Sequence, residues 1–310
     1  MTRQVVCVKW GTVYGPDYVN RMYAMLERHL GPPFRLVCLT DQREGIRAEV
    51  ECFDLPELGC AAPQNTPGKW RKQILWGREV PGLMGVALFI DLDTVIVGPL
   101  DDYFSFGDPG DVILARNWAR PLDRLGQSSI FRYPVGANAH ILENFRADPQ
   151  GIADRYKYEQ HYVTASVKGG IKFWPEPWTR HFRLHCLPSW PLRYFVPARL
   201  PRDARVVTFP GGPNPDDIVM GRWNKRVPPH RSRWAHLMAT FGDAPRASDS
   251  RWRHLQRYIL PPDWIVREWT EAWAGRANRS GGAFRCSVGS ARWASRRRSP
   301  RTAVMAWRSR

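Results

Sequence analysis

Two aspartates separated by one residue, Asp91 and Asp93, are the side chains of this sequence best suited to chemistry. They follow an apolar run at residues 86–90 and precede a Thr-Val-Ile-Val run. Alternate residues of an extended segment point the same way, so both carboxylates can face one ligand. Hard oxygen ligands suit Mg²⁺ or Mn²⁺, which take one or two carboxylates and complete their shell with phosphate oxygens and water. The spacing predicts a cation held by Asp91 and Asp93 against a phosphorylated substrate.

The residues before this pair predict the sheet edge that would position it. Apolar runs at 5–8, 34–39 and 86–90 predict buried strands, with a weaker strand at 49–55. Apolar residues at three- and four-residue spacing over 17–30 predict a helix capped by Asp17. Strand, helix and strand in this order predict a parallel α/β sheet, in which ligands gather at the carboxyl ends of the strands.

The rest of the chain predicts one domain followed by a tail. Strands are expected at 95–97, 112–115, 129–133 and 205–209, and helices at 69–79 and 137–145. Residues 173–201 hold six prolines and three tryptophans, which predicts an irregular but ordered segment. Short helices over 248–271 are expected to close a single domain at 1–272. Residues 273–310 carry ten arginines and no acid, which predicts a flexible basic tail.

The charge of the chain points to an anionic partner. The formal charge is +17, of which the tail supplies +10. The sequence has no apolar run of about 18 residues or more and no secretory signal at its start, so we expect a cytoplasmic protein. Arginines interleaved with Trp293 and Trp307 are suited to peripheral contact with an anionic membrane at its inner face. A nucleic-acid-binding protein acting through the tail is a less favoured alternative.

Several segments, taken in order, resemble glycosyltransferases with the GT-A fold, close to glycosyltransferase family 8 and its bacterial relatives with a DxD motif. They are VVCVKWGTVYG from residue 5, CLTD at 38–41, KWRKQILW at 69–76, LFIDLDTVIVGPLDDYF at 88–104, GQSSIFRY at 126–133 and FPGGPNP at 209–215. The resemblance implies a nucleotide-diphospho-sugar transferase with a Rossmann-like mixed, mainly parallel sheet flanked by helices. It also implies metal-assisted, retaining transfer of a sugar from a UDP-hexose. The sequence does not identify the acceptor, for which a saccharide and a lipid-linked saccharide are the candidates.

The resemblance also implies roles for individual residues. Tyr14 would stack on the base, Lys72 would approach the donor diphosphate, and Gln127 and Gln160 would lie at the reacting centre. The implied nucleotide-sugar-binding residues are Lys9, Trp10, Gly11, Tyr14, Asp41, Lys72, Asp91, Gly211 and Gly212.

One position departs from the family pattern. Relatives usually have a histidine before the glycine at the end of the metal shell, and this chain has Pro210, whose side chain cannot bind a metal. Asp216 and Asp217 could assist the metal, although capping the following helix suits one of them better. Water or a backbone carbonyl are the other candidates for this position.

A haloacid dehalogenase-type phosphatase is the enzyme alternative. LFIDLDTV also resembles the strand-end nucleophile motif of that class, and Asp216 with Asp217 could mimic its later acidic pair. That class usually begins near its nucleophilic strand, whereas here a strand, a helix and a second strand come first. The glycosyltransferase interpretation is therefore favoured.

Overall fold

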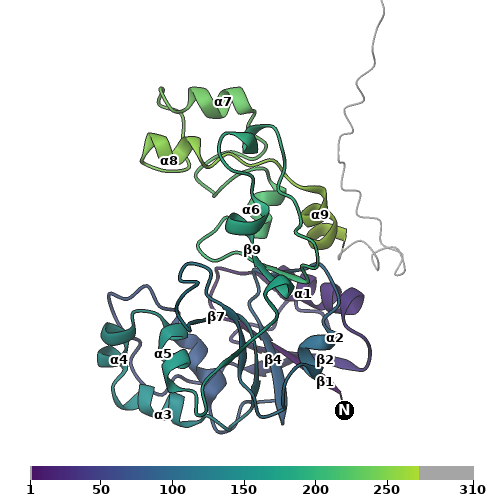
Figure 1. Ribbon diagram of the computed structural model, residues 1–310, viewed down its shortest axis with the longest axis vertical. Coiled ribbons are helices and arrows are strands. Elements are labelled where there is room, and N and C mark those ends of the chain that lie inside the picture. The colour runs from purple at the N-terminus through teal and green to yellow at the C-terminus, as the bar shows by residue number, and fades with distance from the viewer. Residues whose placement is uncertain (1, 272–310) are drawn as a thin grey trace, which may run out of the picture. The chain divides into compact units, whose positions relative to one another are not determined.

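The computed structural model of this protein describes residues 2–271, so the predicted basic tail with Trp293 and Trp307 lies outside the described residues. Within this part, the strands form two sheets (Figure 1). The larger sheet has seven strands in the order β3-β2-β1-β4-β7-β6-β8. These strands are β1 (Arg3–Lys9), β2 (Phe34–Thr40), β3 (Glu51–Asp54), β4 (Val86–Ile90), β6 (Ile113–Arg116), β7 (Gly126–Pro134) and β8 (Lys172–Phe173).

The large sheet is mixed and mainly parallel. Strands β3, β2, β1 and β4 are parallel to one another, and β8 is parallel to β6. Only β7, between β4 and β6, runs antiparallel to both neighbours among the described strands. The predicted α/β fold with a mixed, mainly parallel sheet is confirmed.

The two faces of the sheet follow from the alternation of side chains along β1. Val5 and Cys7 enter one buried cluster together with α1 (Pro16–His29), while Val6 and Val8 enter the opposite cluster. The second cluster includes residues of η1 (Trp70–Trp76), a 3-10 helix where the sequence predicted a helix over 69–79. It also includes residues of α3 (His140–Ala147), α4 (Pro149–Tyr156) and α5 (Glu159–Ser166). Because Val5 to Val8 are buried on both faces of the sheet, β1 has a continuous apolar run at its centre.

The start of α1 differs from the prediction. Gly15 is the N-cap residue and Pro16 begins the helix, so Asp17 does not cap it. Asp17 lies one turn from Arg21 instead, and their side chains form an ion pair at 3.0 Å. The fixed φ of proline suits the first helical position, which moves the start of the helix ahead of the aspartate.

The smaller sheet begins directly after the two aspartates. It contains β5 (Val95–Ile96), β9 (Thr179–His181) and β10 (Val206–Thr208), with β10 antiparallel to β5 and parallel to β9. The segment 173–201 is therefore not wholly irregular as predicted, because it supplies the last residue of β8 and all of β9. Its other described elements are the short helices η2 (Glu176–Trp178), η3 (Phe182–Cys186) and η4 (Leu192–Tyr194).

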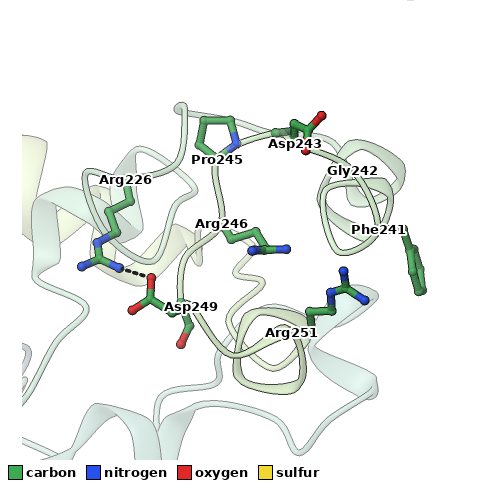
Figure 2. A pocket seen from close by; sticks show the side chains of 10 residues that line it. Arg226, Phe241, Gly242, Asp243, Pro245, Arg246, Asp249 and Arg251 are labelled. Carbon is green, nitrogen blue, oxygen red and sulfur yellow. Dashed lines mark hydrogen bonds and ion pairs between the residues drawn. The ribbon is translucent and has the colours of Figure 1, made fainter.

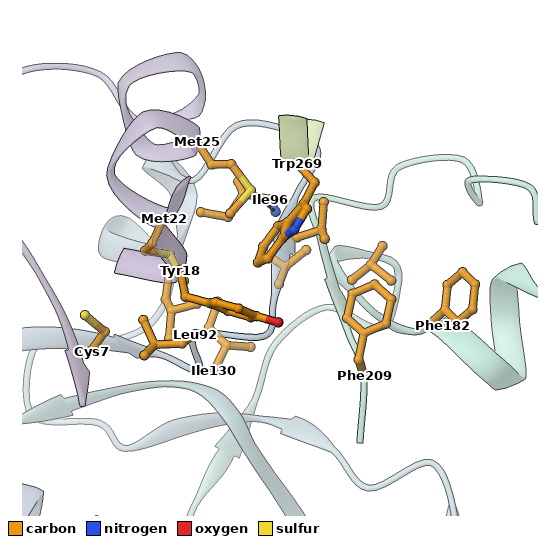
Figure 3. Close-up of a cluster of buried hydrophobic side chains, with 14 of the residues drawn as sticks. Cys7, Tyr18, Met22, Met25, Leu92, Ile96, Ile130, Phe182, Phe209 and Trp269 are labelled. Carbon is orange, nitrogen blue, oxygen red and sulfur yellow. Dashed lines mark hydrogen bonds between the residues drawn. The ribbon is translucent and has the colours of Figure 1, made fainter. Parts of the chain in front are cut away.

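The last described helices are short, as predicted for 248–271. They are α8 (Arg251–Leu255), α9 (Asp263–Val266) and η5 (Arg267–Glu271). The other short helices are α2 (Asp101–Ser105), α6 (Pro215–Val219) and α7 (Arg233–Met238). The indole of Trp269 is fully buried and meets the Tyr18 ring edge-on at 5.3 Å (Figure 3). Its Nε1–H donates to Asp216 Oδ1 at 2.7 Å. Trp269 thus joins η5 to α1 and to α6.

In the described part of the chain, the longest apolar helical stretches fall short of what a membrane crossing needs.

We predict that Trp269→Ala lowers the free energy of unfolding by about 3–5 kcal/mol, because it empties a large buried site. It also removes the donor to Asp216. Chemical denaturation of the full chain measures the change. Trp234→Ala, at a position that is 72% exposed, is the matched control and should change stability by less than about 0.5 kcal/mol. Equal losses in both variants would show that Trp269 does not hold the C-terminal helices to α1.

Candidate functional site

Asp91 is held at the carboxyl end of β4 by backbone contacts. Its N–H donates to the carbonyl of Ser129 on β7 at 2.8 Å, and its own carbonyl accepts from the N–H of Thr94 at 3.2 Å. The second contact closes a turn between β4 and β5. The turn lets one chain segment leave the large sheet, carry both aspartates and enter the small sheet.

Lys72 is the direct partner of Asp91. Its Nζ lies 2.6 Å from Oδ1 and 2.8 Å from Oδ2 of Asp91, and the lysine is buried at the start of η1. Burial alone would lower the pKa of Lys72, but the charges of Asp91 and Glu159 and the hydrogen bond to Asp91 outweigh it, and the pKa is raised. A buried ammonium group therefore stays charged beside the two carboxylates.

Asp93 is held from the other side by the loop after β1. The hydroxyl of Tyr14 donates to Asp93 Oδ2 at 2.9 Å. Burial, followed by the charge of Asp91, raises the pKa of Asp93 to about 6. Burial and the nearby charge of Asp93 also raise the pKa of Tyr14, so the phenol remains a donor. The ring of Tyr14 packs against Tyr18 with centroids 4.7 Å apart, which occupies part of the surface predicted to stack on a base.

A second set of polar side chains lies beside Lys72, where α5 meets β7. Ser128 Oγ donates to Glu159 Oε1 at 3.0 Å, and the other oxygen of Glu159 accepts from the Lys69 N–H at 3.2 Å. The Ser128 N–H points to Gln160 Oε1 at 3.4 Å. The amide of Gln127 is used locally, since it donates to Ser129 Oγ and accepts from the Ser129 N–H.

Glu159 contributes more to the site than the sequence indicated. Its charge acts on both Lys72 and Asp91. No local pattern of residues marks it, because its burial in the first turn of α5 arises only in the folded structure.

The ends of β1 and β2 form the next part of the site. Lys9 closes β1 and is buried, and Trp10 follows it half-exposed. The Gly11 N–H donates to Asp41 Oδ2 at 2.8 Å, so the loops after these two parallel strands are joined. Gly11 has a φ of 59°, a backbone conformation that glycine adopts more easily than residues with a side chain.

The glycine pair follows β10. Strand register pairs Val207 with Val95, so the loop after β10 begins beside the segment that carries Asp93. Gly211 and Gly212 have φ values of 74° and 72°, and a Cβ added to Gly212 would meet nothing within 4 Å. The Gly212 N–H itself donates to the carbonyl of Phe209 at 3.1 Å. The space beside Gly212 lets a ligand approach the backbone of this loop closely.

The two acids after this loop have other partners. Asp216 accepts from Arg21 and from Trp269, both at 2.7 Å. Asp217 accepts from Arg222 Nε at 2.8 Å. They are held by these contacts, so neither one is poised to complete a metal shell in place of Pro210. The later acidic pair of the phosphatase alternative is engaged in the same way.

The donor set at Asp91 and Asp93 fits a hard divalent cation. The described residues contain no cluster of three or more histidine, cysteine or acidic side chains arranged for a metal. Two carboxylates without a third protein ligand are what Mg²⁺ uses when substrate phosphates complete its shell. The raised pKa values of both aspartates reflect burial that a bound cation would offset.

Comparisons with known proteins found likeness only among solved structures. No family model matches this chain, and no curated protein does. The galactosyltransferase LgtC, bound to donor and acceptor sugar analogues, is 13% identical with a TM-score of 0.49, over 68% of this chain and 88% of LgtC. GlyE of Streptococcus pneumoniae is 14% identical with a TM-score of 0.48, over 87% of this chain and 64% of GlyE.

A further similar structure is that of the bifunctional glycosyltransferase WbbM, at 11% identity and a TM-score of 0.46. The match covers 69% of this chain and 46% of the WbbM chain. All three of these solved structures are of glycosyltransferases. Likeness at this level concerns chain topology, and the activity has to be argued from the site.

We predict that Asp93→Asn stabilises the metal-free protein at high pH. The pKa of Asp93 is about 6 in the folded protein and lower in the unfolded chain. The folded state therefore loses stability as the pH rises from the unfolded pKa through 6, whereas the amide of asparagine does not ionise. The variant should gain about 2–3 kcal/mol at pH 8 and almost nothing at pH 4. Denaturation with a chelator present measures both. The exposed substitution Asp123→Asn is the control, and a gain that did not depend on pH would contradict the assignment.

Proposed function

We propose that this protein is a glycosyltransferase that moves a hexose from a UDP-sugar to a saccharide or lipid-linked saccharide, with Mn²⁺ or Mg²⁺ as cofactor. The observation that carries the proposal is the arrangement of Asp91 and Asp93 at the carboxyl end of β4, with Lys72 on one and Tyr14 on the other. Two acids and a buried cationic side chain at a strand end suit a ligand that brings phosphates and a divalent metal.

Each described residue then has a part in holding the donor. Asp91 and Asp93 would hold the cation, which when bound neutralises charge on the departing diphosphate. Lys72 lies where its ammonium can turn from Asp91 to a phosphate oxygen. Gly211 offers its backbone N–H to the same phosphates, and Gly212 leaves room for them because it has no side chain. The joined loops around Gly11 and Asp41 hold the nucleoside beside Trp10.

The reaction needs no protein nucleophile in this proposal. The bond between the anomeric carbon and the diphosphate oxygen breaks, and a bond to the acceptor oxygen forms with retained configuration. The acceptor proton passes to an oxygen of the departing phosphate. Gln160 uses its carbonyl oxygen on Ser128 and offers its amide hydrogens to a sugar hydroxyl. Gln127 positions Ser129, whose carbonyl in turn holds the Asp91 N–H.

We expect UDP to bind the protein in a metal-dependent manner and to lose that dependence when both aspartates are changed. Isothermal titration of UDP with and without Mn²⁺ compares the protein with Asp91→Asn/Asp93→Asn. The affinity for UDP with Mn²⁺ should fall by more than about tenfold, which corresponds to a loss of about 1.4 kcal/mol.

The double variant Asp243→Asn/Asp249→Asn removes the same number of charges from another part of the chain and is the matched control. Metal-dependent UDP binding that survives in Asp91→Asn/Asp93→Asn would remove the aspartates from the site. Absence of UDP binding in all three proteins would count against the UDP donor itself.

Pro210→His should strengthen binding of Mn²⁺ with UDP, because it supplies an imidazole ligand at the loop that begins beside the aspartates. We expect the affinity to rise by about tenfold, provided that the imidazole can approach the cation together with the two carboxylates. Pro210→Ala tests the change of backbone freedom alone. If Pro210→Ala gave the same gain as Pro210→His, the loop would not contribute a metal ligand.

A further inference from the structure

The positive charge outside the predicted tail is concentrated in one stretch. Residues 222–257 hold nine arginines and lysines and two aspartates, which gives this stretch a formal charge of +7. The tail supplies +10 of the total of +17. The residues outside both the tail and this stretch are therefore neutral as a whole. The stretch contains α7, α8 and the loop between them. A surface with this charge favours an anionic partner.

Three large apolar side chains of the same stretch face solvent. Trp234, Met238 and Phe241 are 72%, 66% and 74% exposed. Their spacing of four and three residues places them on one side of α7 and the turn that follows it. The other side is buried, since His236, Ala239 and Thr240 are each no more than 3% exposed. The exposed stripe is therefore not a misplaced core face.

A second segment brings more exposed apolar groups to these helices. The indole of Trp190 meets that of Trp252 on α8 edge-on at 4.8 Å, and the guanidinium of Arg233 lies 5.3 Å from the ring centre of Phe195. The hydroxyl of Tyr194 donates to the carbonyl of Leu255 at 2.7 Å. Trp190, Phe195 and Trp252 are all exposed. Exposed aromatic rings and cationic side chains therefore lie together at α7 and α8.

A hollow of about 520 Å³ is lined mainly by the loop that joins α7 to α8, together with Arg226 and Arg251. Figure 2 shows the side chains of Arg246 and Arg251 directed into it, while Arg226 is held at its rim by Asp249 at 3.1 Å. Phe241 stands beside the hollow. No acidic side chain among the described residues forms an ion pair with Arg246 or Arg251 within the structure. Asp249 is paired with Arg226, so the two other guanidinium groups outnumber Asp243, the remaining carboxylate of the lining. Such a hollow suits an anion such as a phosphate.

We propose that Trp234, Met238, Phe241, Arg246, Arg251 and Trp252, the α7–α8 face, dock on a phospholipid membrane that contains anionic lipids. The apolar side chains enter the interfacial layer of the bilayer, where tryptophan and phenylalanine are favoured. Arg246 and Arg251 bind the phosphates of the lipid headgroups, and the other cationic side chains add long-range attraction.

Charge complementarity selects this occupant over the others. The basic tail of this chain would meet a face of its own sign, and a second copy would bring two stretches of +7 together. A lipid surface supplies both negative charge and an apolar layer, which matches the mixture of exposed arginines and aromatic rings. The inference does not require UDP binding or catalysis, so it can stand or fall independently of the proposed function.

Co-sedimentation of the full chain with vesicles of phosphatidylcholine and phosphatidylglycerol in equal parts tests the proposal. We expect Trp234→Ser/Met238→Ser/Phe241→Ser to lower the partition coefficient by about tenfold. Arg246→Gln/Arg251→Gln should lower it by at least about tenfold, and this loss should shrink at high salt. The basic tail is present in every protein compared, so its contribution cancels.

Two control variants match these changes elsewhere in the chain. Met84→Ser/Leu122→Ser removes exposed apolar side chains, and Arg155→Gln/Lys168→Gln removes exposed charges. Both should bind vesicles as the unchanged protein does. Circular dichroism verifies that each variant is folded.

Hydrogen exchange adds a readout that does not depend on substitution. Vesicles should slow exchange at residues 233–253 in the unchanged protein. The proposal is overturned if the unchanged protein does not bind the vesicles, or if it binds them equally well after both α7–α8 substitutions. Light scattering of the unchanged protein tests for a dimer. The proposal is also overturned if Trp234→Ser/Met238→Ser/Phe241→Ser abolishes such a dimer and still binds vesicles.

Discussion

Two carboxylates held close together at the end of a buried strand are the constraint around which the rest of this structure is arranged. Asp91 and Asp93 repel each other and lose hydration, and burial raises the pKa of both. Lys72 offsets part of this cost at Asp91, and the Tyr14 hydroxyl does the same at Asp93. Each partner comes from a different element, so the pair is stable only when η1, the loop after β1 and β4 are assembled together.

The turn after the aspartates also decides where the second sheet lies. The chain passes from β4 to β5 within five residues, and β5 then recruits β10 by antiparallel pairing. The glycine loop after β10 is brought back to the aspartates in consequence. Asp216 fixes the end of that loop by accepting from Arg21 and Trp269, so the packing of η5 on α1 supports a loop near the site. A contact far from the carboxylates in sequence thus helps to position a part of their surroundings.

The division of charge along the chain separates two kinds of surface. The residues outside 222–257 and the tail are neutral as a whole, and they include the buried acid and lysine pair. The stretch with α7 and α8 combines a formal charge of +7 with exposed aromatic rings. Burial makes electrostatics strong and specific at the aspartates, whereas exposed arginines act over longer distances and are screened by salt. Binding of a compact phosphorylated ligand and contact with an extended anionic surface are therefore assigned to different residues.

The sequence alone was sufficient for what depends on local pattern. The apolar runs at 5–8, 34–39 and 86–90 each became a strand of the central sheet, because strands buried on both faces need continuous apolar residues. Asp91 and Asp93 follow the last of these runs, so their place at its carboxyl end could also be predicted. The tertiary structure alone decided that Lys72 pairs with Asp91, that Tyr14 reaches Asp93 and that Glu159 lies beside them. It also revealed β9 within a proline-rich segment, since a three-residue strand exists only through its pairing with β10. These contacts join residues from 19 to 79 positions apart, and their formation depends on long-range packing that no local pattern of side chains encodes.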